Sequence, residues 1–249
     1  MINDENDVNK YKGKPCAWCG DKYYDRAHVP TKFLIPKSER NRPNLPWPIL
    51  PSCKKCNAGL KLDEEWFAVH FASALSEFSA EANKVFSGPI TKHLTKKPAI
   101  AKRYMKYLDL VELKIMGVSQ GLKTRINMSQ DDWNRLENVA DMFARGLYYW
   151  HTGINASKLK SKIVYLVPKR FENFSKYLKY LIPVELFPGK FEYAYGVTET
   201  NEAVFIIAIY GKPSYLIHLV SEERFNIMEN KVKSGEIKPN KVPGIEILG

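Results

Sequence analysis

The chain has no long apolar segment, and its N-terminus lacks the features of a targeting sequence. Its 249 residues contain no uninterrupted run of about eighteen apolar residues, the length that a membrane-spanning helix requires. Residues 1–10 are polar and lack the apolar core of a secretory signal. Internal repeats and low-complexity segments are also missing. We therefore expect a cytoplasmic, non-repetitive protein with no membrane partner.

Cysteine is scarce, and its placement is informative. The four cysteines, Cys16, Cys19, Cys53 and Cys56, form two C-x2-C pairs within the first quarter of the chain. Disulfides are rare in a reducing compartment, so these thiols favour metal binding. Two pairs with this spacing are typical of a tetrahedral structural zinc site. The sequence therefore predicts one zinc-clamped module.

Acidic residues are too few to balance the basic ones. The formal net charge is +11, which points to an anionic partner, although a lysine-rich surface can also serve solubility alone. Residues 84–125 hold ten Lys or Arg against two acids, and residues 157–190 hold eight against two. Both stretches follow the cysteine segment. We expect this later region to hold nucleic-acid phosphates.

The residues between and after the cysteine pairs carry a more specific pattern. His28-Val29-Pro30 lies between the pairs, followed by Asn44-Leu45, and Asn57 comes directly after the last cysteine. From Cys16 to Glu65 the chain resembles the HNH endonuclease family, in its zinc-containing branch with two C-x2-C knuckles. The resemblance implies a ββα-metal fold for this module.

The resemblance also implies a division of roles. His28 would be the general base, because a neutral imidazole can take a proton from water. Asn57 would be a ligand of a catalytic Mg²⁺ or another divalent cation, and Asn44 would brace its loop. The zinc would be structural only, since four cysteines leave no open position. The implied activity is metal-dependent hydrolysis of phosphodiester bonds in nucleic acid, with DNA favoured over RNA and the choice between them left open. Such an activity would suit defence against phage or mobile DNA.

The chain departs from the family pattern at Ala27. Many HNH nucleases have at this position an acid that also binds the catalytic cation, and alanine offers no ligand. Three explanations remain open: the branch does without the acid, another acid such as Asp25, Asp63 or Glu65 replaces it, or Ala27 is an inactivating change. We favour the first. A non-catalytic, zinc-stabilised nucleic-acid-binding protein is the alternative function. A purely structural zinc module whose helices bind a partner protein is a third.

Eight basic residues are the expected nucleic-acid contacts. Three flank the cysteine site, where they would equally serve to balance the charge of the thiolates, and five lie in the basic stretch that follows: Lys54, Lys55, Lys61, Lys96, Lys97, Lys102, Arg103 and Lys106. Trp18 is expected to plug the core rather than to serve as a stacking platform, since large aromatics are more often buried than functional. His70 is expected to be a packed or surface histidine rather than a ligand. A homo-oligomer or a regulatory partner protein remains open.

The predicted fold class is α+β, with a zinc-clamped ββα-metal module at 10–80 and a basic α+β companion domain at 81–249. The boundary falls near Ala80–Pro89, where turn residues interrupt the apolar periodicity. The companion is expected to begin with a helical region and to end in an antiparallel β-meander with helices. Helices are predicted at Asn57–Ser79, Lys97–Gly117, Ser129–Gly153 and Phe171–Leu181, and strands at Ile163–Val167, Phe191–Val197, Ala203–Tyr210 and Tyr215–Val220.

Overall fold

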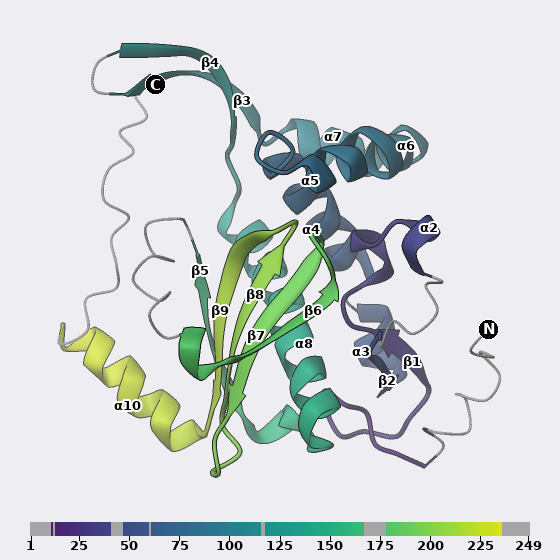
Figure 1. The fold of residues 1–249 in the computed structure, drawn as a ribbon, viewed down its shortest axis with the longest axis vertical. Coiled ribbons are helices and arrows are strands. Elements are labelled where there is room, and N and C mark those ends of the chain that lie inside the picture. Colours follow the sequence, from purple (N-terminus) through teal and green to yellow (C-terminus); the bar gives the residue numbers. More distant parts are fainter. Residues whose placement is uncertain are drawn as a thin grey trace.

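The computed structural model describes residues 11, 13–40, 47–59, 61–115, 118–166 and 178–235, with the backbone alone for 110–126. Mixed helices and strands surround one long helix, α8 (Gln130–Thr152). A five-stranded sheet lies on one side of α8, and the cysteine-containing N-terminal segment lies beside it (Figure 1). The α+β class is therefore confirmed. None of the helices described is long and apolar enough to cross a membrane.

The sequence begins and ends α8 with clear signals. The Ser129 side chain accepts a hydrogen bond from the backbone N–H of Asp132 at 3.3 Å, which caps the first turn. Gly153 ends the helix in the left-handed conformation, at φ 70°. One face of the helix is buried, including Leu136, Phe143 and Leu147. This predicted helix is confirmed.

The predicted meander forms most of the large sheet. The strands are antiparallel in the order β5-β9-β8-β7-β6, with β5 at Lys160–Tyr165, β6 at Ile182–Phe187, β7 at Phe191–Val197, β8 at Ala203–Ile209 and β9 at Lys212–Val220. Strand β6 is an addition that the sequence reading missed. Alternate residues of β8, such as Phe205 and Ile207, are fully buried beneath the sheet. Helix α10 (Glu222–Lys233) follows β9.

Two predicted helices differ from the structure. The stretch Asn57–Ser79 is two helices, α3 (Lys54–Gly59) and α4 (Lys61–Ala74). The Lys97–Gly117 helix is confirmed only over α7 (Pro98–Met105). Its remainder is wrong, because β3 (Leu108–Ile115) follows and forms a hairpin with β4 (Val118–Ile126). Alternating apolar and charged residues after Leu108 favour a strand over a helix. Most of the predicted helix Phe171–Leu181 lies outside the described residues, and Leu178–Tyr180 is a single 3-10 turn, η4.

Short helices complete the fold, and Figure 1 places α5 to α7 together at one end of the molecule. They are η1 (Lys32–Leu34), α2 (Lys37–Arg40), α5 (Ala80–Val85), the π-helical η2 (Phe86–Ile90), α6 (Thr91–Lys96) and η3 (Ala156–Lys158).

The buried core is continuous from the cysteine segment to the last strands. Trp47 packs edge-on against Phe187 of β6, with ring centroids 5.1 Å apart. Lys190, which is 4% exposed, places its ammonium 2.6 Å from Glu81 and 3.1 Å from Glu39. Buried apolar residues on both sides of the predicted boundary thus share one cluster. The boundary itself stays a prediction.

Candidate metal centre

The four cysteine thiols lie together, as the sequence predicts. Their sulfur atoms are all within 4.8 Å of one another, with Cys19 Sγ 3.6 Å from Cys53 Sγ and 3.7 Å from Cys56 Sγ. A zinc–sulfur bond of about 2.3 Å gives a tetrahedron whose edges are about 3.8 Å. The cysteines are free thiols rather than disulfides. This donor set fits a four-coordinate zinc ion.

Local backbone geometry shapes each cysteine pair. After the first pair, Gly20 adopts φ +81° and donates a backbone hydrogen bond of 3.0 Å to the Cys16 carbonyl. A side chain would be strained in this left-handed conformation. In the second pair, the Cys56 backbone N–H donates to Cys53 Sγ at 3.4 Å. Both turns direct sulfur atoms toward the same point.

The rest of the chain fixes the first turn in place. The Asn155 side chain donates a hydrogen bond of 2.6 Å to the Cys16 carbonyl. Trp18 is 8% exposed, and its indole N–H donates to the Met142 carbonyl of α8 at 2.9 Å. Trp18 is therefore a core residue, as expected.

The thiols are poorly suited to ionise together without a cation. Burial raises the pKa of the Cys19 thiol to about 11. Burial, followed by the charge of Cys16, raises the pKa of Cys56 further. A divalent cation would replace the protons on these sulfurs and offset the repulsion between thiolates.

A hairpin and a helix follow the first cysteine pair in ββα order. Strand β1 (Asp25–His28) pairs antiparallel with β2 (Ile49–Ser52), and Cys53 leads directly into α3. The turn of α3 brings Asn57 to β1, where its side-chain amide donates to Asp25 Oδ2 at 2.9 Å. Two oxygen-bearing side chains therefore meet at the exposed end of this hairpin, and carboxylate and amide oxygens suit Mg²⁺.

His28 lies at the other end of the same four-residue strand. It is partly exposed, and its ring packs edge-on against Trp47 with centroids 4.7 Å apart. The Trp47 indole in turn donates to the Pro30 carbonyl at 3.0 Å. Alternation along the strand places Asp25 and Ala27 on one face and His28 on the other. The contact that the structure displays is thus between Asn57 and Asp25.

The three acids considered as replacements for an acid at Ala27, which are Asp25, Asp63 and Glu65, have different contacts in the structure. Ala27 itself is partly buried against the core and pairs with Leu50 across the hairpin. Glu65 is 2% exposed, and both its oxygens lie 2.8 Å from the Lys97 ammonium. Asp63 lies 3.6 Å from Arg135. Asp25 is therefore the one of these acids that contacts Asn57.

Two of the predicted basic residues are held by buried acids. Lys97, although exposed, forms an ion pair with Glu65, and the half-buried Arg103 forms one with the fully buried Asp132. The other six are also exposed: Lys54, Lys55, Lys61, Lys96, Lys102 and Lys106. Asn44 lies outside the described residues.

The sequence reading missed Tyr24. Its ring is 63% exposed, directly before Asp25, and the Lys54 ammonium lies 6.0 Å from the ring centroid. The signal that could have revealed it is the Tyr23-Tyr24 pair at the start of a strand leading to the histidine motif. An exposed ring beside a cation is suited to stack on a nucleic-acid base.

Comparisons with known proteins add no family to this geometry. The chain matches no protein-family model, no curated protein and no solved structure.

Proposed function

We propose that the chain is a zinc-stabilised, metal-dependent endonuclease of the HNH type that hydrolyses phosphodiester bonds in DNA. The observation that carries the proposal is the Asn57–Asp25 contact at 2.9 Å, on a β1-β2-α3 unit next to four clustered thiols. Asp25 supplies the carboxylate that Ala27 lacks, two residues earlier on the same strand face. The family resemblance of His28-Val29-Pro30 adds to this support.

Each group then has a chemical task. The family resemblance assigns to His28 the acceptance of a proton from a water molecule, whose oxygen attacks phosphorus while the bond to the departing sugar oxygen breaks. Because His28 lies at the opposite end of β1 from the Asp25–Asn57 contact and on the other strand face, the bound phosphate must reach across the strand to meet both. That oxygen takes a proton from solvent water. Asp25 and Asn57 would hold a divalent cation, which supplies charge stabilisation to the phosphate and the departing oxygen. Cys16, Cys19, Cys53 and Cys56 would hold the zinc, which would keep the two cysteine turns, and with them β1 and α3, at a fixed distance.

Lys54 and Tyr24 are the residues that would hold nucleic acid near this site. Both are exposed and lie next to each other, at the start of α3 and before β1. The lysine neutralises a phosphate and the ring stacks on a base. Lys55, the next residue of α3, is also exposed.

Cleavage of supercoiled plasmid by the zinc-loaded protein, with Mg²⁺ or Mn²⁺ added, tests the proposal. His28→Ala and Asp25→Asn should each reduce the rate at least about a hundredfold. His151→Ala is the matched control, because His151 is a half-buried histidine on α8. It should cleave like the unaltered chain. Zinc content should stay at one ion per chain throughout. Full cleavage by His28→Ala would remove the assignment of the base.

One observation favours a second function, a non-catalytic protein that binds nucleic acid. Ala27 packs against the core, so the position that carries an acid in many HNH nucleases is here part of the hydrophobic packing. Under this alternative, the zinc-loaded protein binds DNA with an affinity that falls steeply with salt, and no product forms with any divalent cation. Loss of binding in Lys54→Ala together with Tyr24→Ala would locate the surface in either case.

A further inference from the structure

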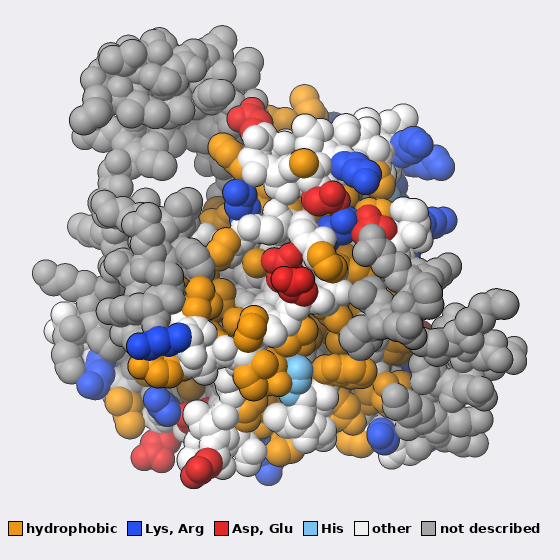
Figure 2. Space-filling view, in the orientation of Figure 1, with side chains coloured by type: hydrophobic (Ala, Val, Ile, Leu, Met, Phe, Trp, Pro, Cys, Tyr) orange, Lys and Arg blue, Asp and Glu red, His pale blue; other side chains and the backbone are white. Residues whose placement is uncertain are grey.

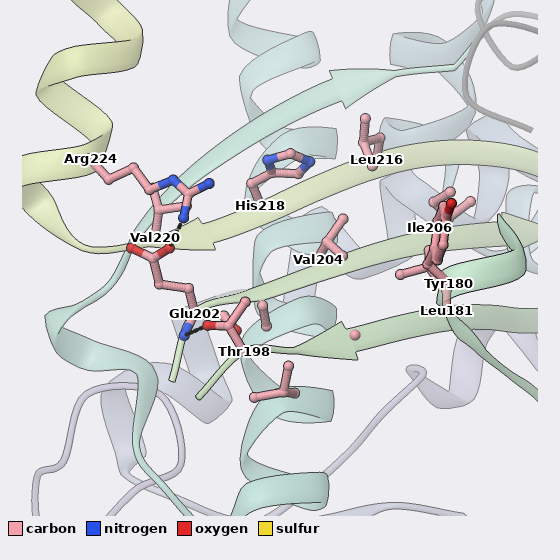
Figure 3. A pocket seen from close by; sticks show the side chains of 13 residues that line it. Tyr180, Leu181, Thr198, Glu202, Val204, Ile206, Leu216, His218, Val220 and Arg224 are labelled. Carbon is pink, nitrogen blue, oxygen red and sulfur yellow. Dashed lines mark hydrogen bonds and ion pairs between the residues drawn. The ribbon is translucent and has the colours of Figure 1, made fainter. Parts of the chain in front are cut away.

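A cavity of about 620 Å³ opens on the outer face of the five-stranded sheet, away from the cysteine cluster (Figure 3). Its floor is made by strands β7, β8 and β9, the face opposite to the one that packs on α8. Arg224 of α10 stands at one end, and Tyr180 and Leu181 stand at the other. Figure 2 shows hydrophobic side chains gathered over the middle of this face. A cavity of this volume is within the range of small-molecule sites.

Away from the Arg224 end, the walls are mostly apolar. Outward-facing residues of neighbouring strands, Val204 and Ile206 on β8 and Leu216 on β9, form the floor. Gly196 adds space, because a Cβ there would lie 3.1 Å from Leu181 Cδ2. Such walls favour a hydrocarbon body over a charged or strongly hydrated one.

Polar groups gather at one end, and most are already paired. The Glu202 carboxylate accepts hydrogen bonds from Ser221 Oγ at 2.9 Å and from Arg224 at 2.6 Å, so the two charges offset each other. The Thr198 hydroxyl lies 3.1 Å from the Glu202 backbone N–H, from which it accepts a hydrogen bond. His218 differs: among the described residues, no hydrogen bond to its ring is formed. Burial, followed by the charge of Arg224, lowers its pKa against the opposing charge of Glu202, which favours the neutral imidazole.

We propose that this cavity binds a neutral small molecule that is mostly hydrocarbon and carries one hydroxyl or carbonyl group, which hydrogen-bonds to His218. A neutral imidazole offers one donor and one acceptor, so it can pair with either group. The hydrocarbon part lies along Val204, Ile206 and Leu216 toward Leu181. An ionised ligand would find no unpaired countercharge at this end of the cavity. The site is separate from the proposed nuclease chemistry and stands without it.

Two fluorescent probes test this inference on the zinc-loaded full chain. Nile red is neutral, aromatic and carries a carbonyl group, whereas pyrene has the hydrocarbon body alone. Val204→Trp fills the cavity and should weaken the binding of both probes about tenfold or more. The matched control is Ile227→Trp, which adds the same ring to α10 at a residue that is 50% exposed and does not line the cavity. It should leave both affinities unchanged.

His218→Leu separates the hydrogen bond from the packing. It should weaken Nile red about fivefold and leave pyrene unchanged. This variant also keeps the inference testable if Val204→Trp does not fold, as judged by circular dichroism. Equal weakening by Val204→Trp and Ile227→Trp would place the probes elsewhere and overturn the site. Equal weakening of both probes by His218→Leu would overturn the role of the imidazole.

Discussion

Glu64 is a carboxyl group held in an unfavourable place. It lies in the first turn of α4, where the Thr31 hydroxyl donates to Glu64 Oε2 at 3.0 Å. Burial raises its pKa from 4.5 to about 7, against the opposing effect of that hydrogen bond. A carboxyl group with a raised pKa in the folded state destabilises the fold once it must ionise. The penalty begins as the pH rises above about 4.5 and is complete above about pH 7.

Glu64→Gln should therefore stabilise the protein at high pH only. The amide keeps a hydrogen-bond acceptor for Thr31 and removes the buried charge. At pH 8 we expect a gain of up to about 3 kcal/mol in the free energy of unfolding, and near pH 4 almost none. Urea unfolding at several pH values measures this difference. A gain that does not depend on pH would show that the charge of Glu64 is not its cause.

Ala27 gives a second prediction at the residue scale. Because Ala27 packs against the core, Ala27→Asp should bury a carboxylate and destabilise the fold by about 1 to 3 kcal/mol. We therefore expect Ala27→Asp to reduce stability without adding cleavage, which differs from a simple restoration of the family pattern. Urea unfolding and plasmid cleavage of the same preparation measure both. A more active variant of unchanged stability would show that the missing acid was the limiting part.

The sequence predicted some contacts of the candidate site and left others undetermined. The cysteine cluster follows from the spacing alone, because only a metal site requires two such pairs. His70 is 4% exposed among aromatic rings, which settles the choice between a packed and a surface position that the sequence left open. The Asn57–Asp25 contact could not be read directly, since it depends on how α3 turns after the second cysteine pair. Similarly, the pairing of Lys97 and Arg103 with buried acids depends on distant elements.

At the scale of elements, α8 and the hairpin β1–β2 approach each other unusually closely at Gly146. A Cβ at Gly146 would lie 2.7 Å from Val29 Cγ2 and 3.0 Å from Leu50 Cδ1. Glycine within a helix is normally unfavourable, and alanine would add about 1 kcal/mol of stability. At Gly146 this gain in stability is absent, because only glycine leaves room for Val29 and Leu50 to pack against the helix.

Gly146→Ala should consequently destabilise the protein by about 1 to 3 kcal/mol, the cost of overpacking. Gly59→Ala is the matched control, because Gly59 is also helical and a Cβ there meets nothing within 4 Å. It should leave stability unchanged or slightly raise it. Chemical denaturation of both variants checks the contrast. A similar response at both positions would contradict the close approach.

Local signals predicted the elements that have distinct ends. Ser129 and Gly153 mark α8, and the turn at Tyr210-Gly211, with φ 51° and 72°, separates β8 from β9. The helix expected at Lys97–Gly117 extends too far because the alternation of apolar and charged residues after Leu108, which favours a strand, was not used. The pairing of β3 with β4 itself is not a local property and could not be read from this stretch.

At the scale of the whole molecule, the shared core predicts one cooperative unfolding event. The Trp18 indole donates a hydrogen bond to the Met142 carbonyl, and Trp47 packs against Phe187. The cysteine-containing N-terminal segment therefore has no hydrophobic core of its own. We expect a single thermal unfolding transition. Its midpoint temperature should decrease by on the order of 10 °C when a strong chelator removes zinc. Scanning calorimetry measures it, and added Zn²⁺, but not Mg²⁺, should restore the midpoint. Two separate transitions would instead support independent domains at 10–80 and 81–249.

The hydrogen bond from Asn155 to the Cys16 carbonyl limits when the first cysteine turn can become stable during protein synthesis. The two partners are 139 positions apart, so at about 5 to 20 residues per second the ribosome needs on the order of ten seconds to deliver the second after the first. During that interval the nascent chain carries its sulfur ligands without the support that holds their turn. A truncated product that stops before α8 should accordingly bind zinc more weakly than the full chain, because nothing fastens the first cysteine turn.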